Sequence, residues 1–275
     1  MKMKKILLLI MLPLLGINMQ VKAQGDLLVS PVRVVFEGKK QKEEISLVNT
    51  GADTAVYSVS FLQYKMTEDG GFEVISKPEE GQLFADPYLR IFPRKVTLAP
   101  HEAQVIRLQL RKTPDMVAGE YRSHLYFRAE KGKSPLGMEV KGADTALMSV
   151  QITPVFGISI PIIIRTSEEN VTSTLSNLKV EKLDTVNNLK FTLNRSGKIS
   201  SYGDLVAEYI PVQGKSIEIG LVRGIAVYTT VDKRNVSMKL TNIKGVDLSK
   251  GKIKLKFTSP KDTPYTVYAE QELVL

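Results

Sequence analysis

The stretch 145-TALMSVQITPVFGISIPIIIR-165 decides the fold of this chain. Apolar side chains occupy every second position on both sides of a short Pro- and Gly-containing interruption: Ala146, Met148, Val150, Ile152, Ile158, Ile160, Ile162 and Ile164. This period of two is typical of an extended strand rather than a helix. At about 3.3 Å per residue the stretch would reach roughly 70 Å, whereas an ordinary strand has about 5 or 6 residues. We therefore expect one long strand, or two collinear ones, that exceeds a single core or passes between two.

Two prolines in this stretch favour a position at the edge of a sheet. Pro154 and Pro161 cannot donate to a hydrogen-bond ladder, which confines them to edge strands, strand starts or bulges. An apolar edge strand invites another chain to pair with it. The same alternation also fits the last strand of an ordinary sandwich with both faces buried, and periodicity alone does not separate these two interpretations.

The segments around this stretch indicate an all-β chain. From Leu27 to Ala129, short alternating segments are separated by turn residues, and no convincing helical run of three turns appears. With the long stretch, about seven or eight strands precede Arg165, which is the number an immunoglobulin-like sandwich needs. A polar segment follows, and then a second set of strands. We predict an N-terminal immunoglobulin-like domain over 24–165 and a smaller C-terminal β-sandwich domain over 166–275.

The first 23 residues predict export. Lysines precede an apolar run from Ile6 to Leu15, and Val21 and Ala23 have the small-residue spacing of a signal-peptidase site, so we expect cleavage after Ala23. The run is too short to span a bilayer, so we expect no stable membrane insertion. Removing the four lysines of the leader lowers the formal net charge from +9 to +5, and the remaining charges are interspersed, which argues against nucleic-acid binding. Without cysteine, stability depends on apolar burial rather than on disulfides.

The residue inventory supports no catalytic centre. The two histidines, His101 and His124, stand near no second histidine or paired carboxylates at ligand spacing. No nucleophile elbow or phosphate-binding loop is present, and no motif pairs the many carboxylates. We therefore expect no enzyme, no metal and no cofactor.

Several motifs resemble the periplasmic pilus-assembly (PapD-like) chaperones of the chaperone–usher pathway. The N-terminal ones are Arg33-Val-Val-Phe-Glu-Gly, Phe92-Pro93-Arg94, Leu98-Ala99-Pro100, Val105-Ile106-Arg107-Leu108, Thr113-Pro114-Asp115 and the long strand ending at Arg165; Ser201-Tyr202-Gly203-Asp204-Leu205 and Gly224-Ile225-Ala226-Val227-Tyr228 give a looser match further on. The segments Gly119-Glu120-Tyr121-Arg122-Ser123-His124-Leu125 and Gly157-Ile158-Ser159-Ile160-Pro161 resemble the archaic, or alternative, branch. The resemblance implies two immunoglobulin-like domains in an L or boomerang, without catalysis.

The resemblance also implies a mode of binding. In this family the last strand of the first domain lends alternating apolar side chains to an unfinished pilus subunit, which is β-augmentation. The expected donated residues here are Met148, Val150 and Ile152, with Phe156 next. Counting back from Arg165 without a gap favours Ile152, Pro154 and Phe156 instead, so the register stays open.

Basic residues are expected to complete the site. Family members hold the C-terminal carboxylate of the subunit with two basic residues between the domains, a charge-assisted contact. Arg33 matches the first of these residues by its motif. The second is a lysine in classical members, and it aligns with Pro161 here. Arg122, on the neighbouring strand, resembles the substitute used by the archaic branch. Arg165 matches an arginine that ties the domains together through carboxylates.

We therefore expect a periplasmic chaperone that caps pilin-like subunits by donor-strand complementation and delivers them to an outer-membrane usher. Self-association through the exposed edge strand stays open. The alternative is a secreted two-domain structural or adhesive component of a surface assembly. Such components usually lack a strand, whereas this first domain has a full set by pattern.

Overall fold

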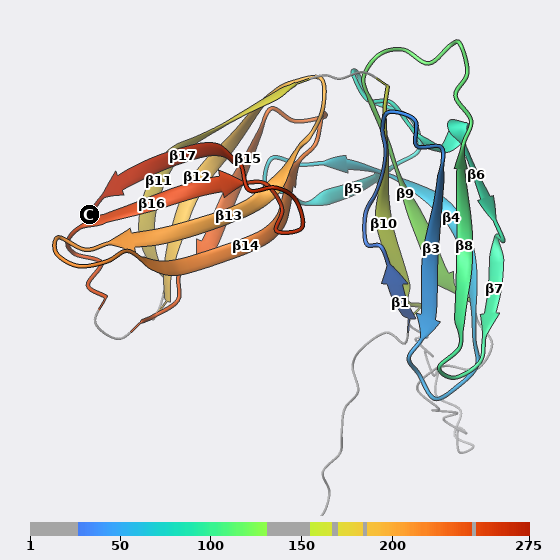
Figure 1. Ribbon diagram of the computed structural model, residues 1–275, viewed down its shortest axis with the longest axis horizontal. Helices are drawn as coiled ribbons and strands as arrows, with labels where there is room; N and C mark the ends of the chain where they lie inside the picture. Colours follow the sequence, from blue (N-terminus) through green and yellow to red (C-terminus); the bar gives the residue numbers. More distant parts are fainter. Residues whose placement is uncertain (1–26, 131–154, 167–169, 184–185, 244–245) are drawn as a thin grey trace, which may run out of the picture.

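The computed structural model describes residues 27–130, 155–166, 170–183, 186–243 and 246–275, and in these residues the chain is all-β. Figure 1 shows two β-sandwiches that meet at an angle, as an L. Among the described residues no helix has the length and apolarity needed to cross a membrane.

The first sandwich is built from strands β1 to β10. One sheet has the order β1-β3-β8-β6, with bounds Leu27–Ser30, Lys42–Asn49, Ala103–Leu110 and Leu89–Phe92. The other has the order β2-β10-β9-β4-β5, with bounds Val34–Phe36, Gly157–Arg165, Glu120–Ala129, Ala55–Met66 and Phe72–Ile75, and β7 (Lys95–Leu98) also pairs with β4. Alternate residues of both sheets form one buried core, which includes Phe36, Ile45, Ile106 and Phe127.

The second sandwich is built from strands β11 to β17 around its own core. A three-stranded sheet has the order β11-β12-β15, with bounds Val171–Leu183, Val186–Gly197 and Lys233–Lys239. A four-stranded sheet has the order β14-β13-β16-β17, with bounds Ile217–Val227, Ser201–Ile210, Lys252–Thr258 and Val267–Val274. Leu189, Leu205 and Phe257 are fully buried between the two sheets.

The first apolar segment of the chain is divided between the two sheets of the first sandwich. The alternation over Leu27–Phe36 suggests one strand, but β1 pairs antiparallel with β3, whereas β2 pairs in parallel with β10. The chain crosses from one sheet to the other at Pro31, after a cis Ser30–Pro31 peptide bond. This crossing places Arg33 immediately before β2.

The described part of the deciding stretch is the strand β10, as the period of two predicts. Ile158, Ile160, Ile162 and Ile164 face the first core. From Ile162 to Ile164 the strand lies between β9 and β2, and all three side chains are fully buried. Of the two interpretations left open by the sequence, an interior strand therefore describes this half, because β2 covers it.

The other half of β10, from Gly157 to Pro161, has one edge without a partner strand in the described ranges, which is called the free edge below. From Gly157 to Pro161 the strand pairs with β9 alone among the described residues. Residues 145–154, with the expected donors Met148, Val150 and Ile152, lie outside the described residues. Phe156, just before the strand, is 51% exposed.

A hairpin links the two sandwiches. In Figure 1 the strands β4 and β5 reach from the first sandwich toward the second. Met66, at the end of β4, is fully buried against Ala226 and Tyr228 of the second sandwich. At the turn of the hairpin, the backbone N–H of Asn235 donates to the carbonyl of Glu68 at 2.7 Å. These contacts set one side of the angle between the sandwiches.

Candidate functional site

Strand β9 presents a row of polar side chains to the second sandwich. Its alternation places Tyr121 and Leu125 in the first core. Glu120, Arg122 and His124 point to the opposite face, and each is at least nine-tenths buried. Charged groups at this depth need partners, so their contacts define the site.

Glu120 accepts hydrogen bonds from both sandwiches. Its carboxylate accepts hydrogen bonds from Arg122 Nη2 at 2.7 Å and from Arg165 Nε at 3.3 Å. From the second sandwich, the backbone N–H and the Oγ of Ser200 donate to it at 3.1 and 2.9 Å. Burial alone would raise the pKa of Glu120, but the two arginines and the Ser200 hydroxyl outweigh it and lower the pKa to about 2. Glu120 is therefore a buried anion shared by both sandwiches.

Two arginines of the first sandwich stack on tyrosines of the second. The Arg33 guanidinium lies 3.9 Å from the centre of the Tyr202 ring, and the Arg122 guanidinium lies 3.8 Å from that of Tyr228. Such cation–π contacts favour a guanidinium over an ammonium group. Burial and the positive charge of Arg122 lower the pKa of Arg33 to about 10, which still leaves Arg33 charged at neutral pH.

The positive charge of Arg33 has no direct counter-ion within the described part of the chain. Arg122 and Arg165 share Glu120, and Arg165 also lies 3.5 Å from Glu37. Among the described residues, no carboxylate lies within ion-pair distance of the Arg33 guanidinium. Arg33 is partly buried beside the Tyr202 ring, which leaves the missing charge to an anion from outside the chain.

His124 is a neutral part of the interface between the sandwiches. Burial, reinforced by Arg122 and Arg33, lowers its pKa to about 3. Its Nε2 lies 3.1 Å from the Tyr228 hydroxyl, and the Tyr64 ring packs edge-on against the imidazole at 4.8 Å. Its role is therefore structural.

The free half of β10 leads toward Arg33. Val34 pairs with Ile162 in a parallel register, so position 33 comes level with Pro161, where the free edge ends. A strand added to this edge would run in line with β2. If it ran parallel to β10, its C-terminal end would arrive beside Arg33.

Three solved structures that match most of this chain are described as chaperones or a chaperone complex. The crystal structure of the YadV chaperone is 14% identical, with a TM-score of 0.46 over 91% of this chain and 100% of that one. The CsuC–CsuE chaperone–tip adhesion subunit pre-assembly complex from the archaic chaperone–usher Csu pili of Acinetobacter baumannii is 13% identical, with a TM-score of 0.46 over 89% of this chain and 99% of that one. The Pseudomonas aeruginosa CupB2 chaperone is 13% identical, with a TM-score of 0.45 over 90% and 100%.

No family model matches the chain, and no curated protein matches it. At 13–14% identity these structures assign no functional residue of this chain, whose site is defined by its own geometry.

The structure brings together the predicted basic residues and adds others. Arg33 and Arg122 lie at the same junction between the sandwiches, while both ion pairs of Arg165 stay within the first. Glu120, Ser200, Tyr202 and Tyr228 were not predicted as site residues. Three of them stand in segments that carry the family resemblance, Gly119–Leu125, Ser201–Leu205 and Gly224–Tyr228, which was the available signal.

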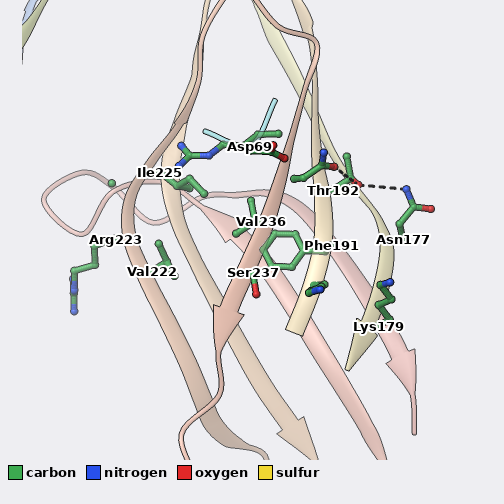
Figure 2. A pocket seen from close by; sticks show the side chains of 14 residues that line it. Asp69, Asn177, Lys179, Phe191, Thr192, Val222, Arg223, Ile225, Val236 and Ser237 are labelled. Atoms are coloured by element: carbon green, nitrogen blue, oxygen red, sulfur yellow. Dashed lines mark hydrogen bonds between the residues drawn. The ribbon is translucent and has the colours of Figure 1, made fainter. Parts of the chain in front are cut away.

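A cavity of about 790 Å³ lies elsewhere, in the second sandwich (Figure 2). Phe191, Val222 and Val236 contribute apolar walls, and Asp69 reaches it from the β4–β5 turn of the first sandwich. The Asn177 amide donates to Thr192 Oγ1 in its wall at 3.3 Å. Within the described ranges, no group of three or more His, Cys, Asp or Glu side chains could hold a metal ion.

Proposed function

We propose that this chain is a periplasmic chaperone for incompletely folded pilin-like subunits. In this proposal the leader 1–23 is removed on export, an immunoglobulin-like domain over 24–165 binds the subunit, and a second domain over 166–275 completes the site. The chain has no catalytic role and passes its subunit to an outer-membrane usher.

The free half of β10 carries this proposal. A backbone edge from Gly157 to Pro161, with partners on one side only, is a template for an additional strand. The edge ends at Arg33, a cation without a carboxylate partner among the described residues. A subunit strand that pairs in parallel would bring its terminal carboxylate to this arginine, which fixes the register of pairing.

Apolar side chains would supply most of the affinity. Phe156 is exposed beside this edge, and we propose that Met148, Val150 and Ile152 continue the row. Each apolar side chain is worth about 1.5 to 3 kcal/mol when fully buried, so three or four contribute roughly 5 to 12 kcal/mol before ordering costs.

Replacing the three proposed donor side chains by serine tests the proposal. Met148→Ser, Val150→Ser and Ile152→Ser together should abolish co-purification with a co-expressed pilin-like subunit, while the circular dichroism spectrum and melting temperature of the chaperone stay unchanged. A matched control is Leu28→Ser with Val105→Ser, which removes exposed apolar side chains from the other sheet. The control should co-purify normally. Co-purification of the triple variant at the wild-type level would contradict the proposed mode of binding.

A further inference from the structure

The second sandwich covers the arginines of the proposed site. Tyr228 lies over the guanidinium of Arg122 and Tyr202 over that of Arg33. Arg122 is only 6% exposed, and its Nε and Nη1 are buried without a hydrogen-bond partner. A carboxylate that approaches from solvent therefore has no direct route to these two donors in the described arrangement.

The hydrogen bonding of the Arg122 guanidinium is incomplete in this arrangement. A buried N–H without a hydrogen-bond partner loses its hydration without compensation. Two nitrogens of Arg122 have no protein partner among the described residues, whereas its Nη2 is satisfied by Glu120 and Ser200. Displacing the covering rings would let an anion satisfy the free donors, so an open arrangement gains bonds that the closed one lacks.

The polar contacts that hold the cover in place lie at two points. Ser200 donates twice to Glu120 and accepts from Arg122, and the Tyr228 hydroxyl pairs with His124 Nε2. At the hairpin turn, Asn235 donates once to the Glu68 carbonyl. The ion pair between Lys233 and Glu68 is half-exposed and is therefore weak. Interfaces of this kind between domains of one chain commonly allow relative motion.

We propose that the second sandwich is a gate over the arginine site. In the resting chain Tyr202 and Tyr228, held by the Ser200–Glu120 contact, cover Arg33 and Arg122, and a terminal carboxylate binds only when the sandwiches move apart. This inference rests on the proposed function for the identity of the partner. A gate of this kind would exclude small anions, because only a partner that also pairs with β10 supplies enough free energy to open it.

A reversible crosslink tests the gate without any partner. The natural chain has no cysteine, so Glu68→Cys with Asn235→Cys introduces a single thiol pair where the two backbones are already hydrogen-bonded. The probe is phenylglyoxal, which modifies accessible guanidinium groups, with peptide mapping by mass spectrometry. The oxidised protein should be modified at Arg33 and Arg122 at least tenfold more slowly than the reduced protein. Arg107, which is 73% exposed, should react equally in both.

A second variant needs no crosslink. Tyr202→Ala removes one cover and should speed modification of Arg33 at least fivefold, whereas Tyr265→Ala, which removes an exposed ring elsewhere, should not. Equal rates in oxidised and reduced protein, or an unchanged rate in Tyr202→Ala, would overturn the gate. Subunit capture is scored separately: slow modification in the oxidised protein, without capture by the reduced protein, would leave the gate standing and reject the proposed function.

Discussion

Glu120 and Ser200 join the two sandwiches through one carboxylate oxygen. Both the backbone N–H and the hydroxyl of Ser200 donate to Oε2 of Glu120, although the two residues lie 80 positions apart in sequence. The same carboxylate accepts from Arg122 and Arg165, so the charge that organises the first sandwich also orients the second. The pH dependence of stability should report on this contact.

Glu120→Gln should remove an acid-sensitive part of the stability. The pKa of Glu120 is lowered from 4.5 to about 2, so its contribution is fully present above about pH 5 and is lost as the pH falls toward 2. The shift corresponds to about 3 kcal/mol. Urea unfolding should give wild type and Glu120→Gln free energies that differ by this order at pH 7 and converge at pH 2. A difference independent of pH would contradict the assignment; Glu218→Gln, at an exposed position, serves as control.

His124→Gln should make the free energy of unfolding less dependent on pH between pH 7.5 and pH 5. The pKa of His124 is lowered to about 3, whereas an unfolded histidine titrates near 6.5, so only the unfolded state gains a proton between these values. Wild type should therefore lose about 2 kcal/mol between pH 7.5 and pH 5 through this residue.

The other histidine provides the matched control. His101 is exposed and has a φ of 61°, which asparagine tolerates, so His101→Asn should keep the wild-type profile. Unfolding midpoints measured at several pH values would distinguish the two variants. If His124→Gln retained the full loss at pH 5, the imidazole would not be buried and neutral as described.

Local patterns predicted the strands but not the contacts between them. The alternation from Ile158 to Ile164 is a property of neighbouring residues, and it gives the inward face of β10 correctly. That Ile162–Ile164 are covered depends on β2, which reaches β10 only because the chain crosses between sheets after Pro31. This crossing depends on pairing with distant strands, which periodicity does not encode.

The site shows the same limit. Motifs identified Arg33 and Arg122, but nothing local shows that Glu120 neutralises Arg122 or that Tyr202 and Tyr228 cover the two arginines. These contacts join residues far apart in sequence and depend on the angle between the sandwiches. Sequence reasoning therefore found the cations and missed what surrounds them.

Arg122→Ala should destabilise the chain, which limits its use as a binding test. Its removal leaves Glu120 buried with fewer partners, and breaking a buried ion pair costs about 3 to 5 kcal/mol. Arg107→Ala breaks the exposed pair with Glu44 and should cost less than about 1 kcal/mol. Urea unfolding at pH 7 measures both. Equal, small effects would show that Arg122 is not held by Glu120.

Arg33→Ala is the cleaner test of carboxylate binding. Arg33 has no carboxylate partner among the described residues, so its loss leaves no buried anion behind, and the fold should be kept. A lost charge-assisted bond costs about 1.5 to 3 kcal/mol, which corresponds to binding roughly 10- to 100-fold weaker. Arg33→Lys should fall between, because an ammonium keeps the charge but not the planar fork.

The readout is the preference of the chaperone for a free terminal carboxylate. A synthetic peptide with the C-terminal sequence of a captured subunit, prepared as the acid and as the amide, should bind wild type more tightly as the acid. Arg33→Ala should bind both forms equally, while Arg90→Ala, on the exposed face of β6 in the other sheet, should keep the wild-type preference. An acid preference that survives in Arg33→Ala would place the carboxylate elsewhere, because no other group at the end of the free β10 edge carries a charge without a counter-ion among the described residues.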